Sequence, residues 1–92
     1  MAEKKENQLW LRVATIQGIV YEDYVKFVQV KKHNGLMIIN RNYSSVMEQL
    51  ADGEIVVHEK SNKVVIDVKD SWLTVNDNRC NIYGTEAKIV GK

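Results

Sequence analysis

Apolar and polar residues alternate in short runs along most of this chain, and small polar turns separate the runs. In one such run, Val64, Ile66 and Val68 occupy every second position. Successive side chains of a strand point to opposite faces, so this period indicates one buried face and one wet face. No stretch of comparable length has the 3.6-residue period of an amphipathic helix. The pattern predicts an all-β fold, a β-sandwich or barrel of about eight to ten short antiparallel strands.

The runs and turns predict the order of these strands. Expected strands cover residues 9–15, 19–21, 24–31, 36–39, 54–60, 63–69, 72–75 and 79–83. The run 24–31 is apolar on both faces, which predicts cover on both sides or a bulge near Phe27. The stretch 46–50 is compatible with either a strand or a helical turn. Turns at 61–62, 70–71 and 77–78 predict three successive hairpins.

The length and the ends of the chain suggest a simple organisation. Ninety-two residues are enough for one domain with a modest core, which buries roughly 60–65% of the unfolded surface. Residues 1–8 are charged and polar and are predicted to form a flexible tail. We expect the sandwich to cover residues 9–87 and a second tail to cover residues 88–92.

Composition argues against several classes of function. The net charge of +1 is unlike that of a dedicated duplex-DNA binder. Cys80 is the one cysteine, so we expect a core residue in a cytoplasmic protein and no disulfide. The longest apolar run, residues 36–39, is far too short to insert into a membrane. No glycine-rich phosphate loop or metal-ligand spacing is present, so no catalytic, cofactor or metal site is predicted, and His33 and His58 are expected at the surface.

Two surface features leave binding alternatives open. The basic run 31–33 with Tyr24 and Phe27 is compatible with a small β-barrel that stacks single-stranded nucleic acid on its rings. A solvated turn explains the same run, and we favour it, so no direct nucleic-acid partner is expected. Trp10 and Trp72 are compatible with partner anchors or with core residues, and we assign Trp72 to the core. Tyr43, an aromatic in a polar loop, is compatible with an exposed contact residue or with plain loop surface.

The run Val13–Tyr21 resembles the opening of the epsilon subunit of F-type ATP synthases. Val28–Val30 is similar to the second long strand of that family, and Leu50–Ile55 is similar to its glycine-led strand. Trp72–Val75 and residues 78–83 resemble its last two sandwich strands. The resemblance covers residues 9–87 with almost no gaps.

This resemblance implies a non-catalytic component of the central stalk in an F-type or F-like rotary ATPase. Such a subunit binds the gamma-type shaft, reaches the alpha/beta-type catalytic head through the complex, and helps to couple ATP turnover to rotation. By resemblance, Thr15, Tyr43 and Glu48 lie near the shaft. The family usually continues into a helical pair that binds ATP or inhibits rotation. This pair would begin at Lys92, so we expect this chain to bind no ATP. A peripheral position at the inner face of the membrane is implied.

One loop departs from the family pattern. The family sequence Pro-Gly-His-x-Pro approaches the membrane rotor ring, and its place is taken here by residues 41–45, which contain neither proline nor glycine. Leu36, Arg41 and Asn42 are the matching candidates for contact with the base of the rotor. Asn42 can adopt the left-handed backbone that glycine would supply. The altered surface argues against the usual ring contact and predicts a soluble or non-ring partner.

Overall fold

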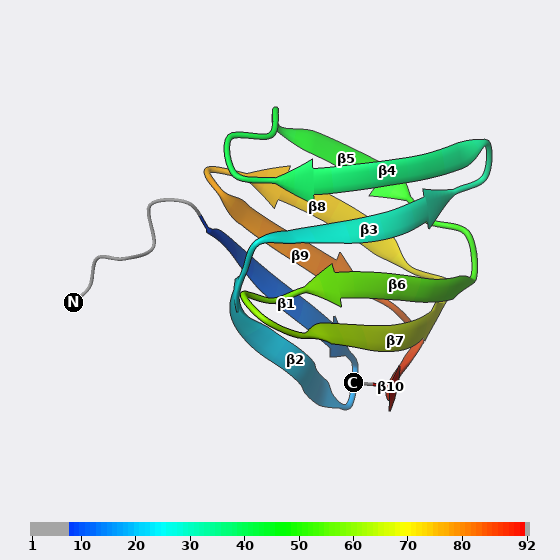
Figure 1. Cartoon of the computed structure of the whole chain (residues 1–92). Helices are drawn as coiled ribbons and strands as arrows, with labels where there is room; N and C mark the ends of the chain where they lie inside the picture. Colours follow the sequence, from blue (N-terminus) through cyan, green and yellow to red (C-terminus); the bar gives the residue numbers. More distant parts are fainter. Residues whose placement is uncertain (1–7, 92) are drawn as a thin grey trace.

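The computed structural model describes residues 8–91, which form ten strands in two sheets packed face to face (Figure 1). The strands are β1 (Leu9–Thr15), β2 (Gly18–Val25), β3 (Phe27–Lys32), β4 (Gly35–Asn40), β5 (Val46–Gln49), β6 (Gly53–His58), β7 (Lys63–Lys69), β8 (Trp72–Asn76), β9 (Arg79–Tyr83) and β10 (Glu86–Gly91). The predicted β-sandwich is confirmed. No helix in the part of the chain that the structure describes could cross a membrane.

Each sheet has five strands. Sheet A has the order β2-β1-β9-β8-β5, and sheet B has the order β10-β7-β6-β3-β4. Neighbours are antiparallel except β1 and β9, which run parallel. Strands β4 and β5 are therefore the edges on one side of the sandwich, and β2 and β10 are the edges on the opposite side (Figure 1).

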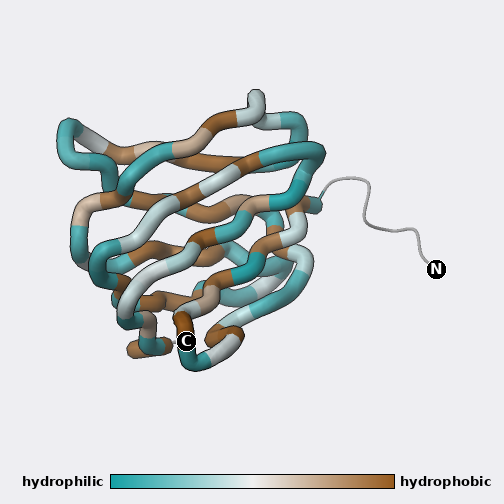
Figure 2. The backbone as a smooth tube through the Cα atoms, turned by 180° about the vertical axis from the view of Figure 1, so that it is seen from behind, coloured by the Kyte–Doolittle hydropathy of each residue, from teal (hydrophilic) through white to brown (hydrophobic). Residues whose placement is uncertain are grey.

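Alternation along the strands builds the core between the sheets. In β1, Leu9, Leu11 and Val13 are fully buried, and in β7 Val64, Ile66 and Val68 face them from sheet B. Figure 2 shows the same alternation as brown and teal segments along the backbone tube. Burial of this apolar area is the main favourable term in folding, because it removes the side chains from water. Cys80 is fully buried among them, which confirms its assignment to the core.

The longest expected strand, residues 24–31, is two strands in the structure. β2 ends at Val25 in sheet A, and β3 begins at Phe27 in sheet B. The chain bends at Lys26, whose N–H donates to the carbonyl of His58 at 2.8 Å. Val25 and Val28 are both buried because the change of sheet shifts the phase of the alternation. The prediction of a bulge or of two-sided cover was therefore wrong.

Two further boundaries differ from the expectations. β2 runs without interruption through Glu22 and Asp23, because its pairing with β1 continues there. The turn at Asp70–Ser71 is a crossover from sheet B to sheet A, since β7 pairs with β6 and β10 and not with β8. The ambiguous stretch 46–50 contributes strand β5.

The C-terminal end of the sandwich also lies further along than expected. Strand β10 continues to Gly91 and pairs with β7, so residues 88–91 are a sheet edge rather than a tail. Its inward residue Ala87 packs against the core. The predicted N-terminal tail falls on residues 1–7, which lie outside the described residues, and on Gln8 before β1.

Candidate partner-binding surfaces

Five of the six candidate residues lie on one side of the sandwich. Leu36 is on β4, Glu48 is on β5, and the connection between these strands carries Arg41, Asn42 and Tyr43. They come together because β4 and β5 are the edges of the two sheets on this side (Figure 1). Thr15 ends β1, next to the opposite edge strand β2.

The loop between β4 and β5 is held by backbone geometry and by polar contacts. Asn42 has a φ of 67°, in the left-handed region that asparagine can adopt in place of glycine. Its N–H donates to the side-chain oxygen Oδ1 of Asn78 at 2.6 Å, and the N–H of Tyr43 donates to the carbonyl of Asn40 at 3.2 Å. The turn between β8 and β9 therefore anchors a loop that has no proline.

Tyr43 differs from the exposed aromatic that the sequence suggested. It is half-buried and packs against the hydrophobic core together with Val46. Beside it, the Nη1 atom of Arg41 donates to the carbonyl of Gln8 at 3.5 Å. Tyr43 therefore supports the domain in addition to any contact with a partner.

Glu48 is a half-buried acidic residue on an edge strand. It pairs with Leu73 of β8, whose side chain is fully buried. Val46 and Leu50, two positions to either side on the same face, also point toward the core. An inward-pointing charge is one way in which natural sheets prevent another strand from pairing with an edge. β5 is thus a poor site for strand addition.

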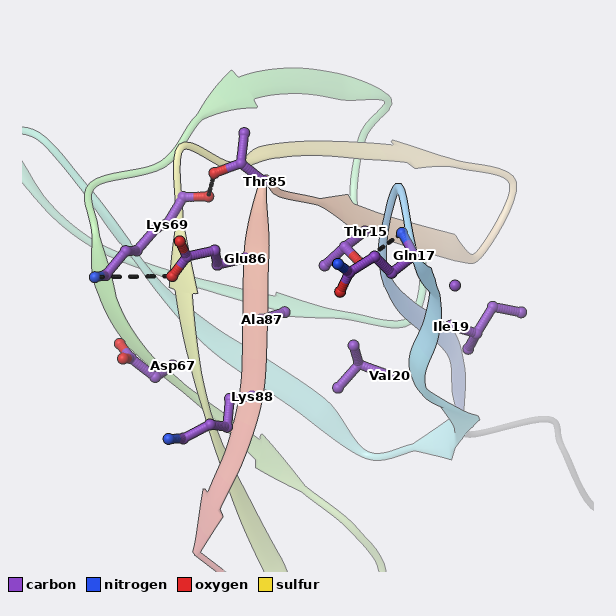
Figure 3. A pocket seen from close by; sticks show the side chains of 11 residues that line it. Thr15, Gln17, Ile19, Val20, Asp67, Lys69, Thr85, Glu86, Ala87 and Lys88 are labelled. Carbon is purple, nitrogen blue, oxygen red and sulfur yellow. Dashed lines mark hydrogen bonds and ion pairs between the residues drawn. The ribbon is translucent and has the colours of Figure 1, made fainter.

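Thr15 lies at the rim of a groove of about 590 Å³ (Figure 3). Its Oγ1 atom accepts from the N–H of Gln17 at 3.1 Å, so the hydroxyl stabilises the turn between β1 and β2. Across the groove, the Nζ atom of Lys69 lies 3.9 Å from the Oε1 atom of Glu86. These groups already have partners within the fold, and the groove presents no concentrated charge to a ligand.

Sequence reasoning missed an apolar surface on the outer face of sheet A. We define the outer apolar face by its exposed side chains Ile19, Met47, Trp72 and Tyr83, which are between 48% and 67% exposed. The assignment of Trp72 to the core was wrong. Its phase, opposite to that of Leu73, was the signal that would have placed it outside.

The outer apolar face is continuous across the sheet. Ile19 pairs with Ala14, Ala14 with Tyr83, and Tyr83 with Trp72, which makes a row about 14 Å long at the usual strand spacing. On β5, Gln49 pairs with Trp72, and Met47 lies two positions away on the same face, opposite Thr74. The nearby Arg12 and Glu22 neutralise each other at 2.6 Å. The row from Ile19 to Trp72 therefore carries no charge of its own, and exposed Arg79 lies at the other end of β9.

The titratable groups with shifted pKa values do not form a reactive centre. Burial raises the pKa of the Cys80 thiol to about 12, so it stays protonated. Burial and the hydrogen bond that Tyr21 donates to Glu59 raise the pKa of Tyr21, and burial lowers that of His58, which stacks on Phe27. No three His, Cys, Asp or Glu side chains in residues 8–91 could hold a metal ion.

The fold is thus a small β-sandwich with exposed apolar area, and the described residues show no cluster of reactive groups. The chain belongs to the family of the ATP synthase delta/epsilon chain, β-sandwich domain, whose sequence profile matches residues 8–89. This membership confirms the resemblance to the epsilon subunit. Subunits of this family are non-catalytic stalk subunits, in agreement with the expectation that the chain is not an enzyme.

Solved structures share the fold at low sequence identity. A chain of the Euglena gracilis mitochondrial ATP synthase, from a structure of OSCP, F1 and the c-ring, superposes with a TM-score of 0.85 at 18% identity. The match covers 97% of this chain and 57% of that chain, so this chain spans little more than half of its length. A chain of the Tetrahymena thermophila mitochondrial ATP synthase central stalk and c-ring has a TM-score of 0.74 and 17% identity, with 94% and 69% covered. No sequence among the curated proteins matches.

Proposed function

We propose that this chain is the sandwich domain of a central-stalk subunit that binds the gamma-type shaft of a rotary ATPase. Through the shaft it helps to couple ATP turnover in the alpha/beta-type head to rotation. Family membership over residues 8–89 supports this role. The Tetrahymena structure with the same fold is described as a central stalk with its c-ring, which adds support from the fold.

The outer apolar face is the observation that carries the proposal. Monomeric soluble proteins seldom expose large contiguous apolar patches unless a partner covers them. Trp and Tyr are the side chains that most often dominate binding energy at interfaces, and here Trp72 and Tyr83 are adjacent in the pairing of β8 and β9. We therefore assign this face to the shaft.

The candidates taken from the family resemblance border this face. Thr15 follows Ala14, which lies within the apolar row, and Glu48 follows Met47 on β5. Tyr43 lies in the loop that leads into β5. Because the three are on opposite margins of sheet A, a shaft that spans the outer apolar face would reach both margins. Their side chains are directed into the sandwich, so it is the margins they occupy, and not contacts of these side chains with the outer apolar face, that support their assignment as neighbours of the shaft.

The test is a binding comparison between two exposed apolar residues of similar exposure. Trp72→Ala should weaken the complex with the purified gamma-type subunit by about 1–3 kcal/mol, the usual loss for an aromatic anchor. Ile38→Ala, on the outer face of sheet B and 52% exposed, is the matched control and should bind like the unmodified chain. Calorimetric titration measures both. Equal affinities for Trp72→Ala and the unmodified chain would remove the outer apolar face from the interface.

A further inference from the structure

Positive charge is concentrated in one segment of the chain. Residues 26–47 contain Lys26, Lys31, Lys32 and Arg41 and no Asp or Glu, which gives this segment +4. Because the whole chain is +1, the other 70 residues carry −3. The segment includes the hairpin of β3 and β4, with Lys31 and Lys32 beside its turn and Lys26 before its open end. Neither Lys31 nor Lys32 forms an ion pair within residues 8–91.

β4 differs from the other three edge strands in having no protection against pairing. β2 has a register irregularity opposite Val13–Ala14, β10 has one between Ile89 and Gly91, and β5 is short and carries Glu48. Such irregularities and inward charges discourage strand addition. β4 has six residues in regular register and contains neither charge nor proline.

The outward groups of β4 are suited to a further strand. Its residues Leu36 and Ile38 are 63% and 52% exposed on the outer face of sheet B. The carbonyl of Asn40 accepts from Tyr43 in the following loop, so it points away from β3. Alternate residues of an antiparallel strand point their backbone groups the same way, so Leu36 and Ile38 also direct N–H and C=O groups to the open edge.

We infer that β4 binds an extended segment of an acidic partner, which adds to sheet B as a sixth strand. The added backbone pairs with the outward groups of Leu36 and Ile38. Its alternate apolar side chains cover these two residues, and its carboxylates meet Lys32 at the turn of the hairpin and Lys26 at the other end, whereas Lys31 extends toward Gly53 of β6. This mode of recognition combines main-chain hydrogen bonds with side-chain contacts at every second position. The partner is a protein segment different from the shaft, on a surface separate from the outer apolar face.

The experiment uses the full chain and a capped peptide of about ten residues, with alternating Val and Thr between two pairs of Glu. Fluorescence anisotropy should show saturable binding that weakens with salt, because the ends of the complex are charged. The same peptide with N-methyl groups on alternate residues should lose at least about tenfold in affinity, since it cannot form the ladder. That loss distinguishes strand addition from simple charge attraction.

Variants of the chain test the same edge from the other side. Ile38→Pro removes an outward N–H and should reduce peptide affinity at least about tenfold, whereas Ile38→Ala keeps this group and should reduce it less. If the proline variant fails to fold, Ile38→Lys replaces it as the test of this edge, because it leaves the backbone intact and places a charge on the edge strand. Trp72→Ala should leave peptide binding unchanged. Failure of the proposal for β4 can therefore be distinguished from failure of the assignment of the shaft to the outer apolar face.

Four results would overturn the inference. They are absence of saturable peptide binding, equal affinity for the N-methylated peptide, tighter binding of a single-stranded oligonucleotide than of the peptide, and a self-association that Ile38→Lys abolishes. A fifth result can come from cross-linking through a cysteine introduced at Leu36. The native Cys80 is buried, so the introduced cysteine would be the one that reacts. A dominant product with a small, very hydrophobic ring subunit would assign this edge to the membrane rotor.

Discussion

At the scale of the residue, Tyr43 combines packing against the core with a proposed contact to the shaft, and a substitution that removes its side chain affects both. Its ring is half-buried against the core, in a loop that the family resemblance places near the shaft. Tyr43→Ala should lower the free energy of unfolding by about 1–3 kcal/mol, because it removes a partly buried aromatic contact. Urea denaturation measures the loss. Any effect of this variant on shaft binding must be corrected for it.

The control for this prediction is Tyr43→Phe, which keeps the ring and deletes the hydroxyl. It should unfold close to the unmodified chain and bind the shaft normally if the ring supplies the contact. A Tyr43→Ala protein with unchanged stability would show that the packing of this side chain contributes little. Unchanged shaft binding by that variant would exclude Tyr43 from the shaft interface and leave it with its packing role alone.

At the scale of the element, the loop between β4 and β5 takes its shape from a different turn. Asn78, in the turn between β8 and β9, accepts from the backbone of Asn42 and has itself a φ of 62°. Asn78→Gly keeps this left-handed backbone and deletes the acceptor. The amide of Asn42 should then exchange its hydrogen about fivefold faster, because a typical hydrogen bond stabilises by about 1 kcal/mol.

Hydrogen exchange followed by NMR separates this effect from general loosening. The amide of Val57, in the centre of sheet B, is the internal reference and should keep its rate. Faster exchange at both amides would indicate lower global stability. An unchanged rate at Asn42 would show that Asn78 does not hold the loop.

The elements also show what the sequence could and could not predict. Alternation identified most strands, because one face of each strand is buried and the other is wet. It could not say to which sheet a strand belongs, so the change of sheet at Lys26 and the crossover at Asp70 were missed. Both are tertiary features, since hydropathy is the same whichever sheet receives the chain. The clustering of Leu36 with Tyr43 also depends on the meeting of two edges and has no local signal.

At the scale of the whole molecule, the buried thiol should make the fold sensitive to alkali. Burial raises the pKa of Cys80 from 9.0 to about 12, so above pH 9 the unfolded chain releases a proton that the folded chain retains. The folded state is therefore favoured below pH 9 and loses this stability as the pH rises. Between about pH 8 and about pH 10 the free energy of unfolding should fall by about 1 kcal/mol on this account.

A variant without the thiol tests that assignment. Cys80→Ala should show a smaller decrease over the same pH range, although its absolute stability is lower because of the cavity. Val75→Ala, which pairs opposite Cys80 and also enlarges the core space, should keep the full decrease. Urea midpoints at the two pH values give the comparison. Equal slopes for the two variants would exclude Cys80 as the titrating group.

The parallel pairing of β1 with β9 has a consequence for biosynthesis. Leu11 of β1 pairs with Cys80 of β9, 69 positions later. β1 is the first strand to leave the ribosome, and its second edge stays unpaired until β9, the last strand but one, has been synthesised. Contacts of such long sequence separation slow folding. Strands β3, β4, β6 and β7 pair only among themselves until β10 arrives, and they can form an early four-stranded nucleus. A nascent chain stalled before Arg79 would then expose the inner apolar side of that nucleus, and chaperones would recognise it in this interval.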